Sequence, residues 1–131
     1  MGYRSQVVLA LDAKIVPAFM AMFAKNEEAQ KLCTQYADTL DTDYQGEGNW
    51  LMVWEGIKWY DSYPDVGAVV KFIEALNLDD LSEYGMKNIE DSDGGGCEGY
   101  FKFCRVGEDD NDVESDGWAF HDIAIQRDIS Y

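Results

Sequence analysis

Apolar and polar residues alternate through residues 3–11, which predicts that the chain begins with a β-strand. The side chains expected on one face of this strand are Tyr3, Ser5, Val7, Leu9 and Leu11. A helix is expected between residues 12 and 25. Pro17 places its first turn near Val16, because a proline deeper inside would remove a helical hydrogen bond. Its buried side is predicted to contain Phe19, Met20, Met22 and Phe23.

Asn26 is a suitable N-cap for a second helical segment, because two glutamates follow it in the first turn. This segment is predicted to run to about Ala37, either as a separate helix or as the second part of one kinked helix. Its inward side chains are predicted to be Ala29, Leu32, Cys33 and Tyr36. A short strand over residues 39–44 is expected to pair with the next strand through the glycine-containing turn at residues 45–48.

Residues 50–59 contain three of the four tryptophans and are apolar on both faces for half their length. That pattern indicates a strand inside a sheet, and Gly56 indicates a β-bulge within it. Ser62 is predicted to cap the following helix, with Pro64 in its first turn and Asp65 completing a capping box. One stripe of that helix is predicted to consist of Val66, Val69, Val70, Ile73 and Leu76.

The second half of the chain has a weaker pattern. A polar turn with a short helical segment is expected at residues 77–84, a weak strand at residues 85–93 and a clearer strand at residues 98–106. An acidic loop is expected at residues 107–117, and residues 118–131 are predicted to form a final strand.

The order of these elements places two helical units between paired strands, which predicts one α+β domain over residues 1–131. The expected architecture is a two-layer sandwich in which the helices cover one face of a mixed or antiparallel sheet. A ferredoxin-like arrangement with one added strand is the favoured topology.

The chain is strongly acidic, with a formal net charge of −16 at pH 7. Such a field repels nucleic acid and anionic membranes and favours basic partners. No apolar run approaches the length of a membrane span, and three cysteines without metal-ligand spacing are typical of reduced thiols in the cytoplasm. Because the chain has one histidine, we expect no zinc site, and no motif indicates a cofactor.

A run of carboxylates without a cation lies between residues 108 and 116, and we predict that it forms the partner-binding surface. Its members are Glu108, Asp109, Asp110, Asp112, Glu114 and Asp116. Four of them alternate, so an extended backbone would place them on one side about 6.6 Å apart, a pitch that imitates a row of phosphates. The acid also clusters by region, since residues 79–131 carry fifteen acidic and four basic side chains, against eleven and six in residues 1–78. The alternative is a solvated loop whose charge only maintains solubility.

Secondary candidates for the partner-binding surface lie elsewhere in the chain. They are Asp91, Asp93, Glu98, Lys58 and Tyr60. Lys58 and Tyr60 are polar residues in an otherwise apolar turn, and the sequence indicates no structural task for them. Asp91 and Asp110 each begin an alternation of acids that resembles a calcium loop. In neither register does a glutamate occupy the twelfth position, so we predict no metal site.

No catalytic group is predicted. His121 is the only histidine and is expected on a strand face beside isoleucines, which favours a structural role. The glycines at residues 94–96 lack the lysine and the helix start of a phosphate-binding loop. We therefore expect a protein that is not an enzyme.

Short motifs along most of the chain resemble a group of small acidic proteins encoded by phages and prophages. They are MGYRS at the start, KWY followed by YPDV in the middle, RVGED before the acidic loop and RDI near the end. The resemblance implies a setting in the cytoplasm of a host cell, and it assigns no activity and no functional residues. By analogy, small acidic phage proteins include inhibitors of host defence, among them DNA mimics that block restriction or CRISPR nucleases.

The leading hypothesis is therefore a non-enzymatic phage protein that binds a basic host protein of the nucleic-acid-binding type, and that binds neither nucleic acid nor membrane itself. The alternative is a phage structural or assembly protein that forms a homodimer through the sheet face opposite the helices. The apolar residues expected on that face are Trp50, Trp54, Trp118, Phe101 and Phe103. A third alternative is an enzyme that uses the carboxylates with a metal.

Overall fold

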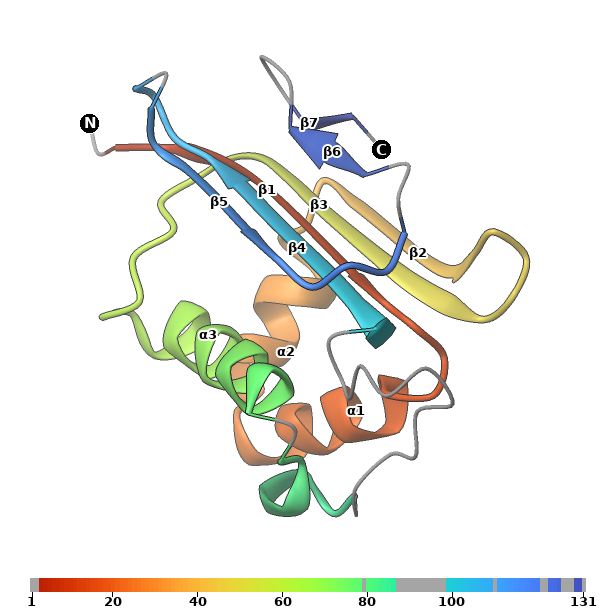
Figure 1. Cartoon of the computed structure of the whole chain (residues 1–131). Helices are drawn as coiled ribbons and strands as arrows, with labels where there is room; N and C mark the ends of the chain where they lie inside the picture. Colours follow the sequence, from red (N-terminus) through yellow and green to blue (C-terminus); the bar gives the residue numbers. More distant parts are fainter. Residues whose placement is uncertain are drawn as a thin grey trace.

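The computed structural model describes residues 3–78, 80–86, 99–109, 111–120, 123–125 and 129–130. The elements in chain order are β1 (Ser5–Leu11), α1 (Val16–Lys25), α2 (Glu27–Thr34), β2 (Thr39–Tyr44), β3 (Asn49–Ile57), α3 (Pro64–Asn77), the short 3₁₀ helix η1 (Ser82–Tyr84), β4 (Phe101–Val106), β5 (Val113–Asp116), β6 (Ala124–Ile125) and β7 (Ile129–Ser130). The α-helices lie on one face of a five-stranded sheet, and β6 and β7 lie on the other (Figure 1).

The strand order in the large sheet is β2-β3-β1-β4-β5, and every neighbouring pair is antiparallel. The order β2-β3-β1-β4, with helical connections after β1 and β3, is that of the ferredoxin-like arrangement, and β5 is the added strand. The predicted α+β sandwich with helices on one face is confirmed.

The first helical unit consists of two helices rather than one kinked helix. α1 and α2 are separate helices, because Asn26 adopts an extended conformation between them and its side chain accepts a hydrogen bond from the Ala29 amide.

The main core fills the space between the sheet and the helices. β1 is buried on both faces, with Val7 and Leu9 toward the helices and Val8 and Ala10 toward the other side. The buried stripe of α3 consists of Val66, Val69, Phe72, Ile73 and Leu76. Each such side chain contributes about 1.5–3 kcal/mol of transfer free energy when it is fully buried. Because β1 contributes side chains to both cores, it is the strand on which both layers depend.

Two details of the helices differ from the prediction. α2 ends at Thr34 rather than near Ala37, and Tyr36 beyond it is 64% exposed instead of inward. Met20 is 53% exposed, although its neighbour Phe19 is fully buried, because successive helical residues are turned by about 100° around the axis.

The passage from β3 into α3 is partly as predicted. The bulge at Gly56 is confirmed, since the pairing of β3 with β1 shifts register beside it. Ser62 does not cap α3. Tyr63 occupies the N-cap position without a side-chain hydrogen bond, and the Asp65 carboxylate accepts from the Val66 amide. The chain stays extended one residue longer than predicted, because the residue before a proline avoids the helical conformation.

The predicted homodimer surface is wrong for most of its residues. Almost fully buried in the main core, on the helical side, are Trp54, Phe101 and Phe103, and Trp50 packs against that core. The opposite sheet face has a smaller core of Val8, Ala10, Leu51, Val53, Cys104 and Ile123. Because Ile123 follows β5 in the chain, the centre of this face is covered by the protein's own C-terminal part. Trp118, 42% exposed, is accessible as predicted.

The final strand predicted over residues 118–131 is also wrong. β6 and β7 form a separate antiparallel pair, and Phe120 has a φ of 55°, which interrupts an extended chain. Most of the weak strand predicted at residues 85–93 lies outside the described residues, as does His121. Among the described helices, none combines the length and the apolar composition that a membrane crossing requires.

Candidate functional site: the hairpin between β4 and β5

Arg105 on β4 lies among the carboxylates of the hairpin that follows it. Its guanidinium group donates to both oxygens of Asp112, at 2.5 and 3.2 Å, and its Nε donates to Glu114 at 3.1 Å. It also donates to the Ser5 hydroxyl at 3.0 Å, and the side chain is only 12% exposed. The pairing register places Glu114 directly opposite Arg105. The contact with Asp112 is bidentate, and a bidentate ion pair is stronger than a single contact.

Tyr3 connects the N-terminal segment to the same hairpin. Its hydroxyl donates to Asp112 at 2.7 Å and accepts from the Asp109 amide at 3.0 Å. Its own amide donates to the Tyr60 hydroxyl at 2.8 Å. Tyr60 therefore has the structural task that the sequence does not indicate, since it joins the β3–α3 connection to the N-terminal segment.

The hydrogen bonds of this network change the acidity of its members. The hydrogen bonds from Arg105 first, and then from Tyr3, lower the pKa of Asp112. The Asp109 amide lowers the pKa of Tyr3, but the hydrogen bond to Asp112, burial and the Asp112 charge outweigh it, so the pKa of Tyr3 is raised. The hydrogen bond to Asp112 is also the main reason that the pKa of Arg105 is raised. At neutral pH Asp112 is thus a carboxylate, Arg105 a guanidinium and Tyr3 a neutral phenol.

Gly107 begins the turn of the hairpin, where the side chains of Asp112 and Tyr3 leave little space for a further one. The Gly107 amide donates to the Asp112 carbonyl at 2.8 Å, and the Asp112 amide donates to the Asp109 carbonyl at 3.0 Å. A Cβ atom at Gly107 would overlap the Asp112 carboxylate and the Tyr3 hydroxyl. The close approach of these groups depends on the missing side chain.

The prediction of an acidic loop without a cation is corrected in two ways. Residues 113–116 form β5 rather than loop, and Arg105 partly neutralises Asp112 and Glu114. These two carboxylates do lie on one side, as the alternation predicts.

The other predicted partner-binding residues divide between the tip and β5. Glu108 and Asp109 are exposed at the tip, where Glu108 accepts from the Arg4 amide at 3.4 Å. Asp116 is half-buried opposite Phe103. The predicted residues that lie outside the described residues are Asp91, Asp93, Glu98 and Asp110.

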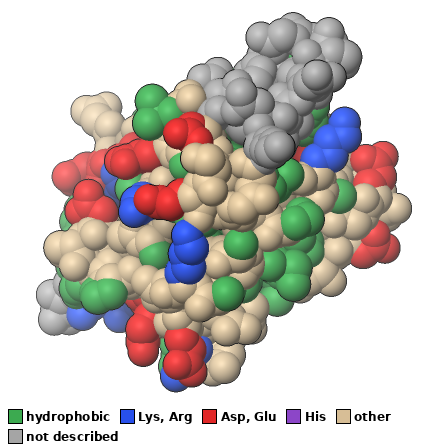
Figure 2. Space-filling view, turned by 90° about the horizontal axis from the view of Figure 1, so that it is seen from below, with side chains coloured by type: hydrophobic (Ala, Val, Ile, Leu, Met, Phe, Trp, Pro, Cys, Tyr) green, Lys and Arg blue, Asp and Glu red, His purple; other side chains and the backbone are tan. Residues whose placement is uncertain are grey.

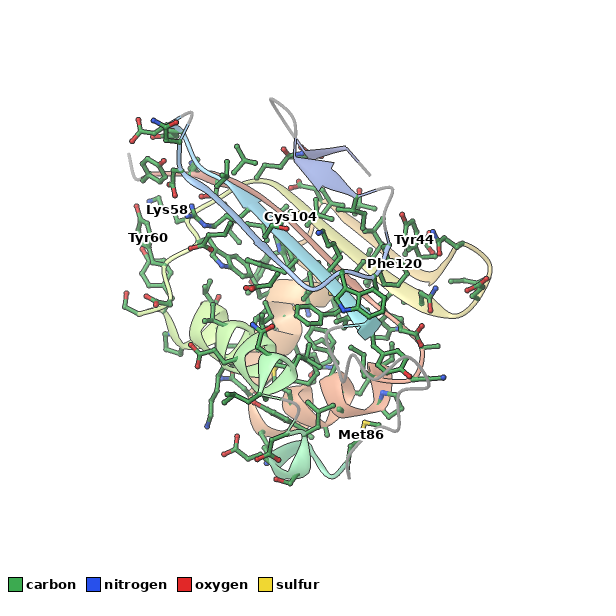
Figure 3. All side chains as sticks on the ribbon, in the orientation of Figure 1. Tyr44, Lys58, Tyr60, Met86, Cys104 and Phe120 are labelled. Atoms are coloured by element: carbon green, nitrogen blue, oxygen red, sulfur yellow. The ribbon has the colours of Figure 1, made fainter. Side chains whose placement is uncertain are left out.

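Lys58 does not belong to this network. It lies half-buried beside a different hollow, which is also lined by Arg4 and Asp65. Figure 3 shows Lys58 and Tyr60 at the end of the molecule where the N-terminal segment and the β4–β5 turn lie. Tyr60 hydrogen-bonds that segment through its hydroxyl, whereas Lys58 shares a hollow with Arg4.

A second acidic area lies at the β2 edge, and its residues are not among those that the sequence predicts to bind a partner. Its members are Asp38, Asp41, Asp43 and Glu47, and none of them forms an ion pair with another described residue. Asp38 accepts from the Glu55 amide at 2.7 Å, and Asp43 accepts from the Gly48 amide at 2.8 Å. The three acids within residues 38–43, without a cation between them, are the signal that could have found this area. Charge on an edge strand also discourages pairing with another sheet.

Comparisons with family models, curated proteins and solved structures find no match for this chain. The resemblance to phage proteins therefore stays an expectation. Among the described residues, no group of three or more His, Cys, Asp or Glu side chains is placed to hold a metal ion.

Proposed function

We propose that this chain is a binding protein that presents its acidic surface to a basic host protein of the nucleic-acid-binding type and catalyses no reaction. The observation that carries the proposal is the fixed position of the hairpin tip. Glu108 and Asp109 are exposed, while the contacts of Arg105, Tyr3 and Asp112 hold the backbone beneath them. A preorganised anionic surface loses little conformational entropy on binding.

The distribution of charge supports the same proposal. On the face that carries the helices, acidic side chains lie mainly toward the margins, and lysine and arginine side chains lie among them (Figure 2). The acidic tip and the β2 edge belong to opposite edges of the sheet, β5 and β2. A net charge of −16 accelerates the approach of a basic partner, and complementary local patches select its orientation.

The finer proposal is mimicry of nucleic acid. The exposed carboxylates of Glu108 and Asp109 at the tip, with Glu114 on β5, which stays exposed although it contacts Arg105, offer neighbouring anions to a phosphate-binding groove. The resemblance to phage proteins suggests a restriction or CRISPR nuclease in the host cytoplasm as the target. The homodimer alternative receives less support, since most of its proposed surface lies in the main core.

The test is capture of purified nucleic-acid-binding proteins by the immobilised chain at about 0.05 M and about 0.5 M salt, followed by competition with duplex DNA. Exposed charges are screened within about 10 Å at 0.1 M salt, so we expect capture that weakens at high salt and is displaced by DNA. The double variant Glu108→Gln/Asp109→Asn should lose most of the capture.

The matched control is Glu28→Gln/Glu74→Gln, which removes the same charge from exposed helical positions. Equal capture by both double variants would overturn the assignment of the hairpin tip. Capture that DNA does not displace would overturn the mimicry.

A further inference from the structure

A pocket of about 490 Å³ lies where the N-terminal segment, the β3–α3 connection and the β4–β5 hairpin meet. Its aromatic and acidic lining residues are Tyr3, Trp59, Tyr60, Asp61, Asp112 and Glu114. The volume falls in the range of about 300–1,000 Å³ that is usual for ligand pockets. Aromatic rings and carboxylates thus face one shared space.

The charge of the pocket is negative. Its carboxylates are Asp61, Asp112 and Glu114, and Arg105 is the cation in its lining. Arg105 is held by its contacts with Asp112 and Glu114. Asp61 is exposed and forms no ion pair with another described residue. An anion would be repelled here, and an apolar ligand would leave the carboxylates poorly solvated.

The aromatic walls are held in place from behind. The Trp59 ring lies 5.3 Å from Trp54 and 6.0 Å from Phe103, centroid to centroid, and both of those rings are buried. The Tyr60 ring lies 5.2 Å from Tyr63. Tryptophan and tyrosine faces attract cations, with tryptophan the stronger, so fixed rings beside carboxylates favour a cationic guest.

We propose that this pocket binds an arginine side chain of the basic partner, with its guanidinium group against Trp59 and Tyr60 and its N–H groups toward Asp61. Arginine fits better than lysine, because a planar guanidinium stacks on aromatic rings and donates to carboxylates in a fork. The inference rests on the proposed function and deepens it. The acidic tip provides attraction over a distance, and the pocket provides a specific anchor.

The experiment titrates the full chain with the peptide acetyl-Gly-Arg-Gly-amide and, separately, with its citrulline counterpart, which has the same shape without the charge. Binding is followed by NMR through the Trp59 indole signal. We expect saturable binding of the arginine peptide with a shift at Trp59, and an affinity for the citrulline peptide at least about tenfold lower. Equal affinities, or shifts confined to the hairpin tip, would overturn the proposal.

Variants locate the site. Asp61→Asn is an exposed substitution and should weaken arginine binding several-fold, and Tyr60→Leu should do the same through the lost ring. The matched control Glu28→Gln removes one exposed carboxylate from α2 and should leave the affinity unchanged. A control that weakens binding as much as Asp61→Asn would show general attraction only and would sink the pocket assignment.

The outcome separates this inference from the proposed function. If capture of a basic protein is lost in the tip variant but is unchanged in Asp61→Asn, the pocket proposal fails and the acidic-surface proposal stands. If binding of the arginine peptide requires Asp61 while capture of basic proteins is unchanged in the tip variant, the tip assignment fails and the pocket proposal stands.

Discussion

Arg105 holds both carboxylate oxygens of Asp112, at 2.5 and 3.2 Å, from seven positions earlier in the chain. This pair converts an acidic turn, which could have been a solvated loop, into an ordered hairpin. Tyr3 reinforces it from the other end of the sequence. The exposed acids Glu108 and Asp109 thus stand on a turn that is held by another acid, Asp112, which is used within the protein.

Arg105→Met should destabilise the protein by about 1–3 kcal/mol, because the half-buried Asp112 and the exposed Glu114 lose their shared partner. Urea unfolding followed by tryptophan fluorescence measures this difference. The matched control is Lys71→Met, which removes an exposed pair with Glu83 and should cost at most about 1 kcal/mol. Similar costs for the two variants would contradict a special role for Arg105.

Stability should fall in acid partly through Asp112. Its pKa is lowered in the folded state by Arg105 and then Tyr3, so its contribution is present above the unfolded pKa of about 3.9 and is lost as pH decreases through the folded value. Asp112→Asn should therefore lose less stability than the original chain below about pH 4. Parallel curves of unfolding free energy against pH for the two chains would rule this out. Glu28→Gln controls for the loss of one charge.

Gly107→Ala should destabilise the hairpin, because the added methyl group overlaps Asp112 and Tyr3. A cost of about 1–3 kcal/mol is typical of an inserted methyl group without space, and urea titration measures it. Gly56→Ala is the control, since a Cβ there meets nothing within 4 Å. A Gly107→Ala chain as stable as Gly56→Ala would show that the turn can move apart without cost.

Cys33 and Cys104 should be inert in the native protein. Both are buried, and burial is the main cause that raises the pKa of each thiol. In a Cys97→Ser chain, a thiol reagent at pH 8 should therefore react only at the rate of unfolding. Rapid reaction without denaturant would contradict the burial of these two side chains.

Most of the sheet and helices could be predicted from the sequence. The alternation of apolar residues predicts β1 and β3, and helical spacing predicts α1. The start of α2 is predicted by Asn26, whose side chain caps the helix. Such signals are local, because the period of burial is set by the geometry of one element. Local signals failed at element boundaries, as at Ser62, where the extended conformation that Pro64 imposes on Tyr63 outweighed the capping ability of the serine.

The sequence by itself determined the fold class and the concentration of acid, because both depend on residue types and their spacing. Only the tertiary structure decided which carboxylates stay exposed and which pair with Arg105, and it alone placed Tyr3, Tyr60 and Asp61 around one pocket. These contacts depend on strand register and on the meeting of distant segments. Charge along a chain predicts attraction, whereas the position of each charge in space decides what it contacts.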